Sequence, residues 1–157
     1  MVYRLKALSS PKTRYQSSLL LLEGSHLLEE ALKADLLPVE IIATQKWVDG
    51  HIDLLRRIPF EVKIQVVTHS VLKAALTTVT PDGVASVLSL DSLPQLKVQP
   101  EFVLALDRVQ DPGNLGNLFR TALAAEVEVI WQASGADPLG QKVLRSSAGA
   151  VLNLPFE

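Results

Sequence analysis

The sequence of 157 residues contains no cysteine, which excludes disulfides, thiolate chemistry and cysteine-ligated metal sites. A chain without cysteine is compatible with the cytoplasm, the location that we expect. Long apolar runs are missing too: the run from Leu19 to Leu22 is too short for a membrane span or for the core of a signal peptide. Apolar residues nevertheless make up 48% of the chain, so the composition is that of a globular protein without membrane spans.

Net charge is small as well, since the formal value of −2 gives no sign of nucleic-acid binding by itself. The charges are unevenly spread: residues 1–22 contain no acid and four basic side chains, Arg4, Lys6, Lys12 and Arg14, which makes this stretch +4 and leaves −6 for the remainder. Such a basic arm is a candidate RNA-binding patch that contacts phosphates. The alternative is a solvated and poorly ordered terminus.

The first ninety residues alternate between strand-like and helix-like segments. Periodicity predicts strands at 19–23, 39–43, 62–67 and 84–90, and helices at 25–33, 52–58 and 68–76. The next segment, 91–100, contains two prolines and little periodicity, which is typical of a linker. We therefore predict a small α/β domain at 1–90, followed by a linker at 91–100.

A second domain is predicted at 101–157. Its pattern is a strand at 102–106, a helix at 115–125, a strand at 127–131 and a further strand-like segment at 150–154. Strand, helix and strand in this order form the opening βαβ unit of a parallel sheet, so the predicted fold class is α/β throughout. A parallel sheet this small cannot cover both of its faces, and we expect it to lean on other polypeptide.

The turn from Asp111 to Arg120, Asp-Pro-Gly-Asn-Leu-Gly-Asn-Leu-Phe-Arg, is the most informative part of the chain. It joins the strand at 102–106 to the following helix, the place where α/β proteins commonly bind ligands. Asn114 is predicted to cap the helix, and Asn117, Arg120 and Thr121 share the face opposite the apolar stripe. An arginine suits a phosphate, because its planar guanidinium makes two parallel hydrogen bonds and stays charged.

A purely structural interpretation of the same turn stays open. Asn114 would then only cap the helix, Gly113 and Gly116 would only permit the turn and close packing, and Arg120 would only be solvated. The glycine spacing fits neither a P-loop nor a dinucleotide-binding turn. The three histidines are scattered and fit no metal site, and Trp131 is interpreted as a core or interface residue.

Residues 106–122 resemble the first motif of the SpoU-type RNA 2′-O-ribose methyltransferases, of the SPOUT superfamily. Residues 142–150, followed by Leu154-Pro155, are similar to the next strand region of that family. Weaker similarities to its substrate-binding domain follow in the right order: Leu8-Ser9-Ser10-Pro11-Lys12, Leu22-Glu23-Gly24 and the segment 78–84. The resemblance thus covers nearly the whole chain.

The resemblance implies an RNA-binding domain followed by the start of a knotted, Rossmann-like catalytic domain. Such an enzyme transfers a methyl group from S-adenosylmethionine to a ribose 2′-hydroxyl of rRNA or tRNA, and is expected to be a homodimer at full length. The family's catalytic Asn and Arg map onto Asn114 and Arg120. Arg120 would orient the adjacent phosphate and favour the developing alkoxide. Arg145 is a candidate RNA contact, with a structural salt bridge as the alternative.

The glycine-rich loop and the Ser-Leu-Asn helix that hold the methyl donor in that family find no match in this sequence. We therefore expect no methyl transfer from this polypeptide alone. The main alternative function is a non-catalytic RNA-binding module, whose affinity would depend on the basic arm and not on Arg120. A third interpretation, a metabolic domain that binds a small phosphate compound, predicts no salt-dependent RNA binding.

Overall fold

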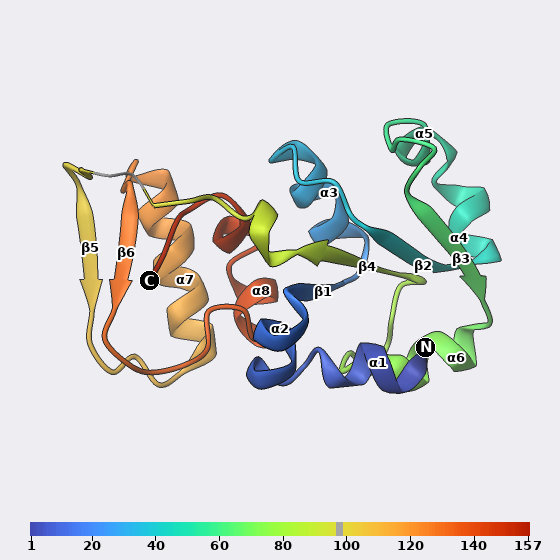
Figure 1. The fold of residues 1–157 in the computed structure, drawn as a ribbon, viewed down its shortest axis with the longest axis horizontal. Coiled ribbons are helices and arrows are strands. Elements are labelled where there is room, and N and C mark those ends of the chain that lie inside the picture. Colours follow the sequence, from blue (N-terminus) through green and yellow to red (C-terminus); the bar gives the residue numbers. More distant parts are fainter. Residues whose placement is uncertain (97–98) are drawn as a thin grey trace. The chain divides into compact units, whose positions relative to one another are not determined.

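The computed structural model describes residues 1–96 and 99–157 and divides into two compact units, Met1–Ser92 and Leu93–Glu157 (Figure 1). The break after Ser92 falls within the predicted linker. In the described residues no helix is both long and apolar enough to cross a membrane.

Unit 1 contains a four-stranded sheet in the order β1 (Leu19–Glu23), β4 (Val84–Ser89), β2 (Glu40–Thr44) and β3 (Lys63–Val67). β4 runs antiparallel to both of its neighbours, while β2 and β3 are parallel. β1, β2 and β3 therefore share one direction. All four predicted strands are confirmed, with ends that move by one residue at most.

The helices of unit 1 include two that the sequence predicted well, α3 (Ser25–Lys33) and α6 (His69–Ala75). The helix predicted at 52–58 is shorter, α5 (Ile52–Leu55), because the chain closes there into tight turns: the Ile58 N–H bonds to the Leu55 carbonyl only three residues back. α4 (Gln45–Gly50) was not predicted. A short 3₁₀ turn, η1 (Leu90–Ser92), ends the unit.

The basic N-terminus folds into two further helices, α1 (Val2–Ala7) and α2 (Pro11–Ser17). Pro11 occupies the first turn of α2 behind an extended Ser10, a typical helix start. Leu5 and Leu8 are buried in the core. The alternative of a poorly ordered terminus is therefore not what the structure shows.

Two apolar clusters cover the two faces of the sheet. One face packs against α1 and α6, through Leu5, Leu8 and Leu72. The other face packs against α3 and α4, through Leu28, Leu32 and Trp47. Figure 1 shows α3 on one side of the sheet and α1 and α6 on the other. Unit 1 is thus a three-layer α/β structure with a core on each face.

Unit 2 contains the predicted βαβ arrangement: β5 (Val103–Leu106), α7 (Pro112–Ala124) and β6 (Val129–Gln132). β5 and β6 are parallel, with Ala105 opposite Trp131. α7 packs against α8 (Gln141–Ser146) and the 3₁₀ turn η2 (Ala150–Leu152). Trp131 is 45% exposed, so it is not a core residue within this unit.

The strand-like segment predicted at 150–154 is a correction. Its residues Ala150, Val151 and Leu152 are buried in η2 instead, because an unbroken apolar run indicates burial without fixing the element. The extended segment comes later. The N–H of Ile130 bonds to the Pro155 carbonyl (3.0 Å) and the N–H of Gln132 to the Glu157 carbonyl (2.7 Å). Residues 155–157 thus run beside β6 as a third, parallel ladder.

Candidate functional site

The helix that carries the predicted site begins at Asp111 and not, as predicted, at Asn114. Asp111 Oδ1 accepts a hydrogen bond from the Asn114 N–H (2.8 Å), and Pro112 occupies the first turn. Asp-Pro is a strong start signal, since proline has no N–H to satisfy there. The hydrogen bond from Asn114, together with the charge of Lys142, holds the pKa of Asp111 below its usual range.

The exposed face of α7 is the one that periodicity predicted. Asn114, Asn117, Arg120 and Thr121 are all exposed, whereas the opposite side is buried at Leu115, Gly116, Phe119 and Ala122. Leu123, predicted in the apolar stripe, is 37% exposed. The stripe is thus narrower than expected, and the polar face is free to meet a ligand.

The loops that follow β5 and β6 are joined to each other. Val109 and Gly135 form a parallel bridge, and the Ala136 N–H donates to the Val109 carbonyl at 2.8 Å. Gly135 has a φ of 136°, a conformation that favours glycine, and a Cβ there would lie 3.0 Å from the Val109 carbonyl carbon. This contact fixes the loop that leads into α7.

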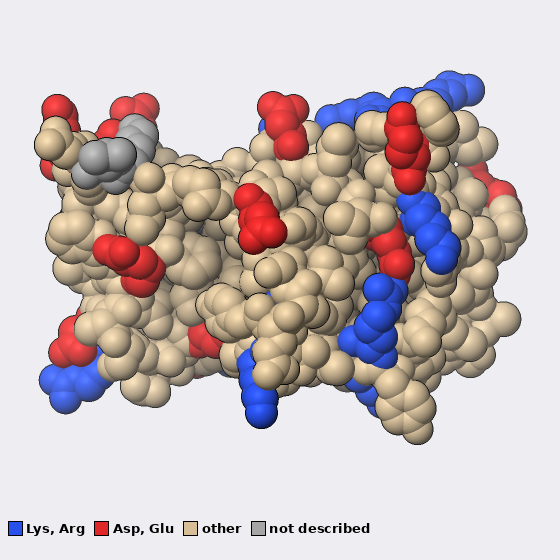
Figure 2. Space-filling view, viewed as in Figure 1, with Lys and Arg blue, Asp and Glu red and all other residues tan. Residues whose placement is uncertain are grey.

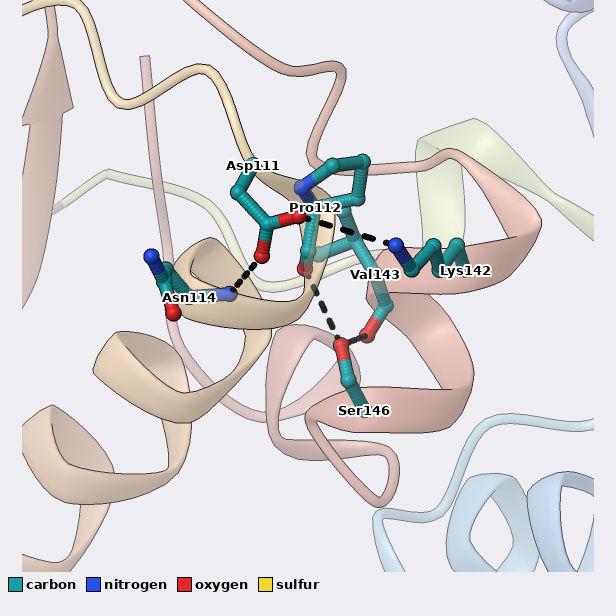
Figure 3. A network of polar contacts seen from close by, with 6 residues as sticks. All are labelled: Asp111, Pro112, Asn114, Lys142, Val143 and Ser146. Carbon is teal, nitrogen blue, oxygen red and sulfur yellow. Dashed lines mark hydrogen bonds and ion pairs between the residues drawn. The ribbon is translucent and has the colours of Figure 1, made fainter.

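The first turn of α7 is also held from α8 (Figure 3). Ser146 Oγ lies 3.1 Å from the Pro112 carbonyl and 3.3 Å from that of Val143, and Lys142 Nζ lies 3.6 Å from Asp111 Oδ2. Sequence reasoning missed both residues. Their only signal was helical spacing, because positions 142 and 146 lie on one face of a helix. Arg145, the predicted RNA contact, is exposed on the same helix.

In the N-terminal arm, the structure corrects the role expected of Arg14. Its side chain is fully buried, and Nη1 donates to the carbonyl oxygens of Leu8 (3.1 Å) and Ser9 (2.9 Å). A buried guanidinium offers no surface to RNA. Arg4 forms an ion pair with Glu40, which compensates part of its charge.

The other basic residues of the arm, Lys6 and Lys12, are exposed. Tyr3 is 89% exposed and Tyr15 61%. Each tyrosine lies three residues from a lysine on the same short helix, so each pair shares a face. On the side of the molecule that Figure 2 shows, basic and acidic side chains are interspersed. Any RNA contact on that side therefore depends on a few side chains and not on a broad basic field.

A shallow, mostly apolar hollow of about 390 Å³ lies at the carboxyl ends of β5 and β6. Trp131, Leu106 and Gln132 line it, together with Asp107. The hollow is open to solvent, and the described residues supply only one of its walls. They therefore do not by themselves enclose a cofactor as large as S-adenosylmethionine.

Comparison with known proteins gives a family for each part of the chain. Residues 1–86 match the MRM3-like substrate binding domain, and residues 101–157 match the SpoU rRNA Methylase family. The chain therefore belongs to the family in which an MRM3-like substrate binding domain precedes a SpoU methylase segment, which confirms the resemblance.

Relatives and solved structures agree with this assignment. The chain is 41% identical to an uncharacterized tRNA/rRNA methyltransferase of Synechocystis, over 99% of this chain and 58% of the relative. It is 33% identical to the 23S rRNA (guanosine(2553)-2′-O)-methyltransferase RlmP of Bacillus subtilis, over 96% of this chain and 58% of the relative. An AdoMet-bound rRNA methyltransferase from Sinorhizobium meliloti has the same fold, with a TM-score of 0.75 and 24% identity over 99% of this chain and 59% of that chain. The chain thus spans less than two thirds of the length of each of these proteins.

Proposed function

We propose that this chain is the RNA-binding part and the opening catalytic segment of an RNA ribose 2′-O-methyltransferase that acts on rRNA or tRNA. The observation that carries the proposal is the exposed Asn114, Asn117 and Arg120 face at the start of α7. It lies just beyond the carboxyl end of β5, where α/β folds bind ligands. The similarity to RlmP, whose name states 2′-O-methylation of a guanosine, supports the reaction type.

In this proposal Arg120 binds the RNA phosphate next to the target ribose and stabilises the alkoxide that forms as the 2′-hydroxyl loses its proton. Its exposure at the middle of α7 suits a phosphate that arrives from solvent. Asn114 lies in the first turn, whose shape the Asp111 cap and the joined loops fix. Arg145 on α8 supplies a further RNA contact.

Unit 1 contributes a second RNA surface on α1 and α2. Lys6 and Lys12 provide the phosphate contacts, and Tyr3 and Tyr15 provide faces on which unpaired bases stack. Aromatic rings beside cations are the usual means of holding single-stranded RNA. Arg4 adds a weaker contribution because Glu40 already pairs with it.

S-adenosylmethionine, as the methyl donor, is part of the same proposal, and so are a homodimer at full length and a cytoplasmic location. When bound, the donor supplies an electrophilic methyl group. The described residues offer only one open wall near the end of β5, so we derive no step through the donor. This is also why we expect the present chain alone to bind RNA without methylating it.

The test is RNA binding by the purified chain, measured as fluorescence anisotropy of a labelled RNA hairpin with a single-stranded loop. Arg120→Ala is expected to weaken binding about tenfold, the usual effect of losing a charged hydrogen-bonding group. Lys73→Ala, which removes an exposed charge from α6, is the matched control. Lys6→Ala with Lys12→Ala should lower the salt dependence by about 0.7 per lost phosphate contact.

Two results would change the assignment. If affinity depends on Lys6 and Lys12 but not on Arg120, the chain is better described as a non-catalytic RNA-binding module. If binding is absent or insensitive to salt, the α7 face does not serve RNA, and a small phosphate compound becomes the better ligand class.

A further inference from the structure

We propose that Ser146 and Lys142 are positioning residues, which hold the start of α7 so that its polar face meets the RNA in a fixed orientation. The inference rests on the proposed function, because it concerns the same α7 face. It adds a role for α8, whose polar side chains fix the helix that presents Asn114 and Arg120 (Figure 3).

The closest contact between the two helices lies at Gly116. A Cβ at this position would collide with Ser146 Oγ and would lie 2.7 Å from the Ser147 backbone nitrogen. Only a residue without a side chain therefore allows α8 to approach α7 this closely. The approach brings the Ser146 hydroxyl to the Pro112 carbonyl, in the first turn of α7. That carbonyl and the Val143 carbonyl share one hydroxyl, so Ser146 links the two helices directly.

Lys142 acts on the same turn from one helical turn earlier in α8. Its ammonium group lies 3.6 Å from Asp111 Oδ2, while Asp111 Oδ1 receives the Asn114 N–H. An exposed ion pair of this kind adds little stability. Its value lies in orientation, because one carboxylate joins the ammonium group of α8 to the backbone of the residue that begins the proposed site.

α8 also carries Arg145, between Lys142 and Ser146 in sequence. The contacts that fix α8 against α7 therefore fix the Arg145 backbone relative to that of Asn114 and Arg120. If both helices touch the RNA backbone, this packing sets the spacing between their cations. Loosening it weakens each contact without removing any RNA-binding side chain.

A double-mutant cycle in RNA binding tests this role, with the labelled hairpin and the purified chain. Ser146→Ala removes no charge and is expected to lower affinity about threefold, the effect of one neutral hydrogen bond. Arg120→Ala should cost about tenfold in the parent chain and clearly less in the Ser146→Ala background, because residues in one network couple. Lys12→Ala, in unit 1, should cost the same factor in both backgrounds. Ser134→Ala, another exposed serine of unit 2, is the control for the substitution itself.

The outcomes separate the inference from the proposed function. If Arg120→Ala keeps its full factor in the Ser146→Ala background, the positioning role is overturned while the proposed function stands. If Arg120→Ala has no effect in the parent chain, both are overturned. Ser146→Thr keeps the hydroxyl and should restore the coupling.

Asp111→Asn gives an independent check should Ser146→Ala fold poorly. The substitution removes a negative charge, which by itself favours RNA binding, and asparagine still caps a helix. We nevertheless expect weaker binding and faster amide exchange at Asn114, because Lys142 loses its partner. Tighter binding with unchanged exchange would overturn the role of Lys142.

Discussion

The Arg14 guanidinium donates to the carbonyl oxygen of Leu8 across the turn between α1 and α2, at 3.1 Å. The same nitrogen reaches the Ser9 carbonyl at 2.9 Å, and the side chain is fully buried. A charge is costly to bury unless hydrogen bonds replace its water. Arg14 therefore fastens the N-terminal helices to unit 1, and the RNA surface on those helices depends on a residue that RNA cannot reach.

Arg14→Ala is expected to destabilise unit 1 by about 3 kcal/mol, since it leaves buried carbonyls without their donor and opens a cavity. Urea unfolding followed by Trp47 fluorescence, in a Trp131→Phe background, reports unit 1 alone. Lys12→Ala, on the same helix but exposed, should leave the midpoint unchanged. Equal midpoints for the two variants would contradict the fastening role.

Glu23 makes a second buried polar contact that the sequence did not reveal. Its carboxylate is 5% exposed and accepts from the Thr77 N–H (2.8 Å), the Thr77 hydroxyl (2.9 Å) and the Thr78 N–H (2.9 Å). Glu23→Gln turns one acceptor oxygen into a donor that faces another donor, so we expect a loss of about 2 kcal/mol. The exposed Glu61→Gln is the matched control in the same unfolding assay. A shift no larger than that of the control would show that Thr77 and Thr78 find other partners.

Sequence periodicity located the sheet and the exposed face of α7 because both follow from apolar spacing. The strand at 19–23 and the side chains Asn117 and Arg120 lie where it placed them. Local pattern could not show that Arg14 is buried, since a charged residue in a basic arm normally faces solvent. Its burial depends on how α1 and α2 fold together, which no spacing encodes.

Polar contacts over long sequence distance were hidden for a similar reason. Ser146 and Pro112 are 34 positions apart, and only the packing of α8 on α7 brings them together. The cap was misplaced because Asn114 and Asp111 both suit a helix start. The proline at 112 decides between them, since it is favoured just inside the helix and Asp111 directly precedes it.

Acid should loosen the start of α7. The Asn114 N–H hydrogen bond and the charge of Lys142 lower the pKa of Asp111 in the folded state. The stabilisation is therefore complete above the ordinary, unfolded-state pKa and is lost as the pH falls through the lower, folded-state pKa. An NMR titration should give a pKa for Asp111 below that of an exposed aspartate, and Lys142→Ala should raise it. An unchanged pKa in Lys142→Ala would show that the ammonium group does not act on this carboxylate.

Gly116→Ala separates helix propensity from packing, because the two effects have opposite signs. Alanine within a helix is favoured over glycine by about 1 kcal/mol. Against this, the new Cβ would lie 2.7 Å from the Ser147 backbone nitrogen and 2.9 Å from the Ser146 carbonyl carbon. Backbone atoms cannot swing aside as a side-chain end can, so α7 and α8 must separate, at a cost of about 1–3 kcal/mol from overpacking.

We therefore expect Gly116→Ala to lower the thermal stability of unit 2 and to increase amide exchange in the first turn of α7. Gly50→Ala is the matched control: it lies at the end of α4, and a Cβ there meets no heavy atom within 4 Å. That variant should be neutral or slightly stabilising. If Gly116→Ala were as stable as Gly50→Ala, the two helices could shift apart freely, and the contact at Gly116 could not be what fixes the face that carries Arg120.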